Sequence, residues 1–252
     1  MRMRKKKNLI PRMERCEAVL IRDGAAHRGH WRELLEPGCP LHVELGCGKG
    51  RFTAETARQN PDVLFLAVER VPDAMVIAME RVCEMGLTNV RFLSCDAALL
   101  PELFEAGEVD RIYINFCDPW PTKRHAKRRL THRGFLALYR KVLAEHGQIH
   151  FKTDNAPLFD WSVEQFEAEG WTLRQVTHDL HQNGPQGVMT DYELKFYELG
   201  VKINRLEATR EPATKGPDAG EVPRLRNASL TDAKGYKESK RANGDNEENG
   251  EI

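Results

Sequence analysis

Short apolar runs alternate with longer helical patterns along most of this 252-residue chain, and this alternation constrains the fold more than any other feature. The apolar runs predict strands at 41–45, 63–68, 90–93, 111–115 and 148–152. Amphipathic periodicity predicts helices at 51–59, 73–85 and 133–144. Strands that alternate with helices form a mostly parallel sheet with helices on both faces. We therefore predict an α/β protein.

The pattern changes after the fifth predicted strand. An amphipathic helix is expected at 157–169, and strands at 171–178 and 191–199 are separated by a polar, glycine-rich segment. Two strands joined by a loop rather than a helix predict an antiparallel edge strand, in a sheet of seven strands. Right-handed crossovers place the carboxyl ends of the parallel strands at one edge, where a ligand is expected to bind.

The sequence divides into three predicted segments. Residues 31–203 contain the predicted sheet, and residues 1–30 form a basic N-terminal arm. Residues 204–252 are polar and lack periodicity, so we expect a disordered tail. No run approaches the roughly 18 apolar residues of a membrane span, and no signal peptide is visible. We expect a cytoplasmic protein without a membrane partner.

Basic residues are concentrated in two places, although the chain has 38 basic and 38 acidic residues and no net charge. The segment 2–15 holds seven basic residues against one acid, and the segment 119–133 holds six without any acid. Such patches are typical of sites for a phosphate backbone, although each run could also be an ordinary solvated surface.

The cysteines indicate neither a disulfide framework nor a metal site. No two of them form a C-x-x-C pair or lie near histidines at a metal-ligand spacing. We expect reduced thiols that act as small apolar residues, and no bound metal. The six are Cys16, Cys39, Cys47, Cys83, Cys95 and Cys117.

A glycine-rich loop follows the first predicted strand and leads directly into a helix. Gly46 and Gly48 allow a tight turn and expose bare backbone at the helix N-terminus. A dinucleotide or a nucleoside could bind there, or the glycines could serve a simple turn. The spacing G-x-G-x-G favours S-adenosylmethionine, which has no pyrophosphate.

Acidic residues follow the next strands at the same edge. Glu69 ends the second strand, where a carboxylate can accept both hydroxyls of a ribose. Asp96 follows the third strand and can accept a hydrogen bond from an adenine amino group, while Glu44 and the glycines could hold an amino-acid moiety. Each acid could instead be a helix cap, but three at successive strand ends predict a pocket for an adenosyl group.

Asp118 lies after the fourth strand, at the expected switch point of the sheet, on a turn stiffened by Pro119 and Pro121. A basic run begins at Lys123, only five positions further on. The reacting edge and a polyanion-binding patch are therefore adjacent, which favours a nucleic acid over a small molecule as the substrate.

The stretch from Asp118 to His132, DPWPTKRHAKRRLTH, strongly resembles bacterial tRNA (guanine-N7-)-methyltransferases. The resemblance runs from about residue 2 to residue 199 and includes 44–50, 151–155 and 190–193. It implies a class I, Rossmann-like methyltransferase fold, S-adenosyl-L-methionine as cofactor, tRNA as partner and methylation of guanine N7 in the variable loop. Family members often carry a lysine where this chain has Thr122, followed here by Lys123.

The resemblance also implies roles for individual residues, with Asp118 as the catalytic residue. Contacts to the cofactor are expected from Glu44, Gly46, Gly48, Glu69, Asp96 and Asp118. Contacts to the acceptor guanine are expected from Lys123, Asp154, Thr190, Asp191, Tyr192 and Glu193. Contacts to tRNA are expected from Arg124, His125, Lys127, Arg128 and Arg129.

Two other functions remain compatible with these patterns. One is an S-adenosylmethionine-dependent methyltransferase of another RNA or of protein, and the other is a non-catalytic RNA-binding module. The intact strand-end acids and glycine loop argue against the module. We expect a monomer or a homodimer.

Overall fold

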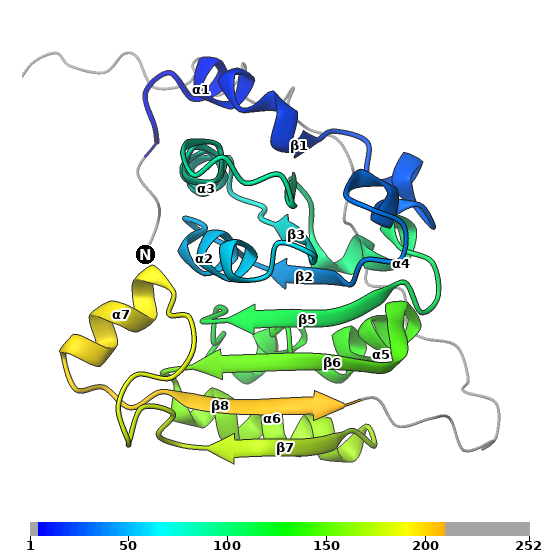
Figure 1. Cartoon of the computed structure of the whole chain (residues 1–252). Coiled ribbons are helices and arrows are strands. Elements are labelled where there is room, and N and C mark those ends of the chain that lie inside the picture. Colours follow the sequence, from blue (N-terminus) through cyan, green and yellow to red (C-terminus); the bar gives the residue numbers. More distant parts are fainter. Residues whose placement is uncertain (1–4, 210–252) are drawn as a thin grey trace, which may run out of the picture.

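The computed structural model describes residues 5–209, which form an eight-stranded sheet in the order β1-β4-β3-β2-β5-β6-β8-β7 with helices on both faces (Figure 1). The strands are β1 Leu20–Ile21, β2 Leu41–Leu45, β3 Leu64–Val68, β4 Val90–Leu93, β5 Val109–Asn115, β6 Leu143–Thr153, β7 Thr172–Thr177 and β8 Asn204–Thr209. The helices are α1 Leu9–Arg15, α2 Arg51–Gln59, α3 Pro72–Glu84, α4 Leu100–Leu103, α5 Arg133–Val142, α6 Ala156–Ala168 and α7 Asp191–Glu198.

The predicted parallel sheet is confirmed, because β1 to β6 pair only in parallel with one another. The chain adds β3 and β4 on one side of β2 and then returns to place β5 on the other side. The switch point therefore lies between β2 and β5. The arrowheads of β2, β5 and β6 point to the left in Figure 1, so their carboxyl ends share one edge of the sheet.

The antiparallel strand is present but differs from the prediction in place and in residues. It is β8, which lies between β6 and β7 rather than at the edge of the sheet. The segment predicted as a strand at 191–199 is the helix α7. Its start is fixed by a capping box, in which Thr190 and Glu193 each bond the other's backbone N–H. The sheet extends past the predicted boundary at residue 203, since β8 pairs with β6 and β7. Alternate residues of β8 are buried.

The predicted boundary at residue 30 also differs from the structure. β1 pairs with β4 at one edge of the sheet, and α1 packs against α3. Arg12 of α1 forms an ion pair of 2.5 Å with Glu80 of α3. Residues 9–30 are therefore part of the folded domain. The sequence did not predict this, because a strand of two residues, such as β1, is too short to show periodicity. The predicted tail beyond residue 209 lies outside the described residues, as do residues 1–4.

Two apolar clusters lie on opposite faces of the sheet. One contains Leu136 and Tyr139 of α5 and Phe159 of α6, and the other contains Met75 and Met79 of α3. Full burial of each such side chain stabilises the folded state by roughly 1.5–3 kcal/mol. All six cysteines are free thiols. No helix within residues 5–209 is long and apolar enough to cross a bilayer.

Candidate active site at the carboxyl edge of the sheet

A cavity of about 610 Å³ lies at the carboxyl edge of the sheet, at the switch point between β2 and β5. Its lining comes from the residues that follow β2, β3, β4 and β5 and from the segment 127–135. Four residues predicted to bind a cofactor line it: Gly46, Glu69, Asp96 and Asp118. Two others, Glu44 and Gly48, do not.

The glycine loop adopts a backbone that requires glycine. Gly46, Gly48 and Gly50 have φ values of 80°, 57° and 73°, which L-residues with a side chain rarely adopt. At Gly50 a Cβ atom would also lie 2.5 Å from the Cβ atom of Ala78, so this glycine allows α2 and α3 to approach closely. The positive φ values explain why the motif has glycines at these positions. Of the three, Gly46 exposes its backbone to the cavity.

Glu69 and Asp96 line the cavity and also accept hydrogen bonds from backbone N–H groups around it. Glu69 accepts hydrogen bonds from the backbone N–H groups of Gly48 at 2.9 Å and Val71 at 2.8 Å. Asp96 accepts a hydrogen bond from the backbone N–H of Ala98 at 3.0 Å. A carboxylate has about four lone-pair sites, so these bonds leave each group able to accept further ones. The helix-cap role and the ligand role are thus compatible at Asp96.

Glu44 belongs to β2 and is not part of the cavity lining. Its side chain is 2% exposed and accepts hydrogen bonds from the Thr53 hydroxyl and from Asn115 Nδ2, the latter at 3.0 Å. Burial raises the pKa of Glu44 above its ordinary value, and these two hydrogen bonds oppose the shift. Glu44 therefore connects β2, α2 and β5 through these hydrogen bonds.

Glu44→Gln is expected to change the pH dependence of stability. Because the folded pKa is raised, the unfolded chain loses its proton first as pH rises past the ordinary value of 4.5. The wild-type free energy of unfolding therefore falls relative to the variant above that pH, and the difference levels off beyond the folded pKa. Urea unfolding of both proteins at about pH 4, 6 and 8 measures it. The exposed Glu145→Gln serves as control, and a pH-independent difference for Glu44→Gln would contradict this account.

The turn that carries Asp118 has an unusual backbone held by a basic side chain. Phe116 and Trp120 on either side of Asp118 have φ values of 53° and 40°. The Arg129 guanidinium donates to the backbone carbonyls of Pro119 and Trp120, each at 3.0 Å. Strained backbone of this kind persists only where surrounding contacts fix it, and it is concentrated at functional sites. Arg129, predicted to hold tRNA, therefore also braces the Asp118 turn.

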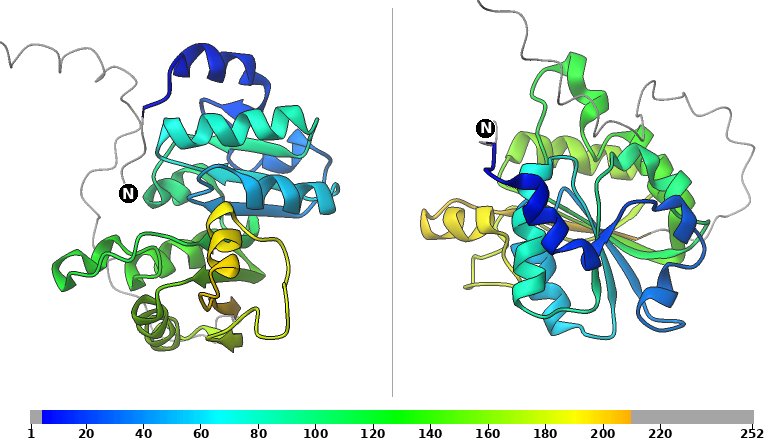
Figure 2. Two further views of the ribbon diagram at one scale, coloured as in Figure 1. Left: turned by 90° about the vertical axis from the view of Figure 1, so that its left-hand side faces the viewer. Right: turned by 90° about the horizontal axis from the view of Figure 1, so that it is seen from above.

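The basic run forms a short 3₁₀ helix, η5 Lys123–Arg128, that projects from the body of the molecule (Figure 2). Lys127 and Arg128 line the cavity, and the Arg128 guanidinium lies 4.7 Å from the centre of the Trp120 ring. His125 contacts the same ring edge-on at 5.8 Å. Lys123 and Arg124 are exposed. The predicted adjacency of the reacting edge and the basic run is thus present.

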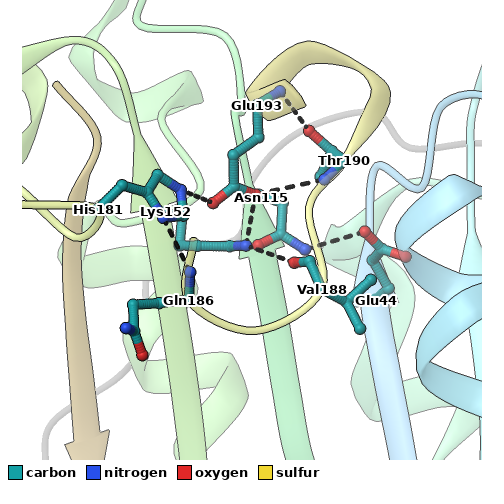
Figure 3. A network of polar contacts seen from close by, with 8 residues as sticks. All are labelled: Glu44, Asn115, Lys152, His181, Gln186, Val188, Thr190 and Glu193. Carbon is teal, nitrogen blue, oxygen red and sulfur yellow. Dashed lines mark hydrogen bonds and ion pairs between the residues drawn. The ribbon is translucent and has the colours of Figure 1, made fainter. Parts of the chain in front are cut away.

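Helix α7 is attached to this edge by a buried ion pair (Figure 3). Glu193 is completely buried and lies 2.5 Å from Lys152 Nζ of β6 and 3.1 Å from His181 Nε2. Lys152 also donates to the backbone carbonyl of Val188 at 3.1 Å. Burial lowers the pKa of Lys152, and Glu193 opposes that shift by stabilising the ammonium. These contacts fix the segment before α7 on the sheet.

The residues predicted to contact guanine differ in their availability. Asp154 is exposed after β6, and Tyr192 is 55% exposed. Thr190 caps α7, Asp191 pairs with Arg81 of α3 at 3.3 Å, and Glu193 is buried in its ion pair. The structure therefore leaves Asp154, Tyr192 and the exposed Lys123 of η5 accessible to a ligand, and it gives Thr190, Asp191 and Glu193 structural partners.

Three functional candidates were missed by the sequence analysis: Asn115, Lys152 and His181. Asn115 lines the cavity and bonds Glu44, and the other two hold Glu193. A lysine inside a predicted strand was an available signal, because a buried lysine needs a carboxylate partner. Nothing in the sequence identified Glu193 as that partner.

The cavity fits S-adenosylmethionine in size and chemistry. Its volume lies in the usual range of roughly 300–1,000 Å³ for small-molecule sites. Glu69 and Asp96 offer acceptors for ribose hydroxyls and an adenine amino group, and Gly46 offers open backbone. Within residues 5–209, no group of three or more His, Cys, Asp or Glu side chains is placed to hold a metal ion.

Comparison with solved structures identifies the class of fold. The 16S rRNA methyltransferase KamB matches with a TM-score of 0.57 and 15% identity, over 73% of this chain and 94% of that chain. An antibiotic-related methyltransferase matches with a TM-score of 0.52 and 17% identity, over 70% and 90%. A family model described as "Putative methyltransferase" matches residues 39–206. The fold and the cavity define a Rossmann-like methyltransferase of class I.

Curated relatives narrow this class. The tRNA (guanine-N(7)-)-methyltransferase of Geobacillus kaustophilus is 47% identical over 213 residues, which cover 84% of this chain and 98% of the relative. The protein of the same name from Streptococcus equi subsp. zooepidemicus is 43% identical over 210 residues, which cover 83% and 100%. The chain belongs to the tRNA (guanine-N(7)-)-methyltransferase family.

Proposed function

We propose that this protein transfers a methyl group from S-adenosylmethionine to N7 of a guanine in tRNA, in the variable loop, and that it acts in the cytoplasm as a monomer or a homodimer. The observation that carries the proposal is the position of Asp118, which lines the cavity beside the basic helix η5. The names of the relatives supply tRNA and the N7 atom.

The reaction needs positioning more than proton transfer. S-adenosylmethionine supplies a methyl group on a positively charged sulfur. Guanine N7 carries an in-plane lone pair and no proton, so no base has to activate it. The protein contributes alignment of the two reactants and stabilisation of the positive charge that the purine acquires. A carboxylate near the purine serves both purposes.

Asp118 and Asp154 are the carboxylates that we assign to the acceptor. Asp118 is exposed at the end of β5 and lines the cavity, so it can orient a guanine next to the methyl donor. Asp154 is exposed at the end of the neighbouring strand β6 and can accept hydrogen bonds from guanine N1 and its amino group. Tyr192 offers an exposed ring for stacking. We assign Glu193 an indirect role, because its carboxylate is bound by Lys152 and His181.

The tRNA backbone is bound by basic residues on two sides of the cavity. A guanine must leave its stack to react, at a cost of a few kcal/mol, and backbone contacts have to hold the remaining RNA. η5 lies on one side. On the other, the backbone N–H of Lys6 bonds Asp73 at the start of α3, next to Val71 of the cavity lining. Lys6 of the basic N-terminal segment therefore lies close to the same cavity.

Arg124→Ala is expected to weaken tRNA binding without changing the affinity for S-adenosylmethionine. Arg124 is exposed on η5, so its loss removes one phosphate contact and lowers the slope of log Kd against log salt by about 1. Fluorescence anisotropy over a salt series measures the slope. Arg174→Ala, which removes an exposed charge from β7, should leave the slope unchanged. An unaltered slope for Arg124→Ala would exclude a phosphate contact there.

Nucleoside mapping tests the function itself. The purified protein is incubated with radiolabelled S-adenosylmethionine and bulk tRNA, and the tRNA is digested and its nucleosides separated. We expect label in 7-methylguanosine at one tRNA position. Label in another nucleoside would replace the proposed acceptor, and absence of label would exclude the enzyme and favour an RNA-binding module.

A further inference from the structure

A second cavity, of about 380 Å³, lies on the α2 side of the sheet. Residues of α2 form one wall, and residues 180 and 186–188 of the segment before α7 form another. The floor consists of side chains from β5, β6 and β8. None of the residues that the sequence predicted for cofactor, guanine or tRNA lines this cavity, so it lies outside the proposed site.

Two residues of the lining each carry a polar atom that has no hydrogen-bond partner within residues 5–209. The atoms are Thr56 Oγ1 and Asn115 Oδ1, and the two residues are only 8% and 6% exposed. Buried polar groups are nearly always satisfied, and each exception requires an explanation such as a bound molecule. Two exceptions that line the same cavity indicate a ligand with hydrogen-bonding groups.

The charges of the lining select the kind of ligand. The lining includes Lys152 and Arg205 but no Asp or Glu. Burial, together with the charges of Arg111 and Arg205, lowers the pKa of His150 to about 3, so His150 is neutral at physiological pH. Both cations have carboxylate partners, Glu193 and Glu207, behind the lining. A neutral or anionic ligand fits these surroundings, and a cationic one does not.

The remaining wall is aromatic and apolar. The rings of Phe52 and Tyr113 meet edge-on with their centres 5.0 Å apart, and Leu180 and Val188 lie in the lining with them. An apolar wall, hydrogen-bonding groups and nearby cations together match a ribonucleotide, which combines a flat base, hydroxyl groups and a phosphate.

The two cavities adjoin at Asn115, which lines both of them. A ligand in the second cavity therefore lies next to the reaction site. We propose that the second cavity binds a nucleotide flanking the acceptor guanine and so contributes to the choice of RNA. This inference rests on the proposed function, because it assumes that the acceptor belongs to an RNA chain.

Thr56→Val tests the cavity, because it removes the unpartnered hydroxyl while keeping the side-chain shape. If the hydroxyl binds a nucleotide, kcat/KM for tRNA falls by about tenfold through a higher KM, the usual size for one lost hydrogen bond. At the same time the free protein becomes more stable, since it no longer buries an unsatisfied group. The affinity for S-adenosylmethionine stays unchanged. Thr88→Val, at an exposed position before β4, is the matched control.

The result that overturns the inference is a more stable Thr56→Val with wild-type kcat/KM, since the cavity then holds only water. A second measurement does not depend on methylation. The ¹³C methyl signals of Leu180 and Val188 are followed while the 5′-monophosphates of the four ribonucleosides are added in the presence of S-adenosylhomocysteine. We expect shifts in the wild type that Thr56→Val loses, and no shifts would reject the site. Wild-type protein that binds nucleotides here but produces no 7-methylguanosine would overturn the proposed function alone.

Discussion

Asp118→Ala is expected to lower kcat for tRNA methylation by at least about 100-fold, the usual loss when one preorganised electrostatic group is removed. Asp118 is exposed and lines the cavity, and Arg129 holds its turn through hydrogen bonds to the backbone carbonyls of Pro119 and Trp120. The backbone geometry is therefore independent of the carboxylate. The variant should fold normally and bind tRNA with an affinity within about threefold of the wild type, because η5 is intact.

Single-turnover kinetics with excess enzyme separate the chemical step from RNA binding. Asp118→Asn keeps the shape and removes the charge, so it should lose nearly as much activity as the alanine variant if charge stabilisation dominates. Asp62→Ala, at an exposed position before β3, should retain full activity. Wild-type kcat in Asp118→Ala would refute a role for this residue in the reaction.

Lys152→Met is expected to have the largest effect on stability, a loss of about 3–5 kcal/mol, because it leaves the carboxylate of Glu193 buried without its cation. Glu193 is fully buried and Lys152 is the closer of its two partners. Most domains have about 5–15 kcal/mol of stability, so the variant should remain folded at room temperature. Urea unfolding monitored by circular dichroism measures the loss.

A double variant separates the ion pair from the packing of the side chains. Lys152→Met combined with Glu193→Gln removes both charges and keeps an oxygen for the capping box of α7. It should be more stable than Lys152→Met alone, because no unpaired charge stays buried. Additive losses in the double variant would contradict a direct interaction between the two residues. Breaking the pair should also raise KM for tRNA, since α7 loses its attachment to β6.

Elements with strong periodicity were predictable from the sequence, and those defined by side-chain hydrogen bonds were not. The central strands β2 and β3 are buried at every position, and burial on both faces leaves a clear apolar pattern in the sequence. Alternation in 191–199 predicted a strand, but the capping box of Thr190 and Glu193 begins a helix there. A Thr followed three positions later by Glu was the signal, and it was interpreted only as part of a family motif.

β8 was missed for a different reason. Only Leu206 and Ala208 are apolar among its buried positions, and Asn204 is buried through hydrogen bonds to His178 and Thr153. A strand with only two buried apolar residues and one buried polar residue has a sequence much like that of a polar tail. Its place in the sheet is determined by pairing with β6 and β7, which are distant in sequence.

Site residues whose position follows from the backbone topology could be predicted from the sequence. The roles of residues that depend on side-chain partners elsewhere in the chain could not. Strand ends and glycines follow from topology, so Gly46, Glu69, Asp96 and Asp118 were correctly placed together at one edge. Whether a carboxylate faces a cavity or an internal partner depends on residues far along the chain. Glu44 meets Asn115, and Glu193 meets Lys152, for this reason.

The switch point between β2 and β5 divides the sheet into a half expected to bind the methyl donor and a half expected to bind the acceptor. Glu69 and Asp96, expected to hold the methyl donor, lie after β3 and β4, whereas Asp118, Asp154 and α7, expected to handle the acceptor, lie after β5 or later. Within the sheet the halves meet along one strand pair, β2 with β5, and outside the sheet they are joined by contacts such as the ion pair between Arg81 and Asp191. Substitutions in the later half can therefore alter which RNA is accepted while the donor half keeps its geometry, so substrate choice and cofactor use can evolve separately in this fold.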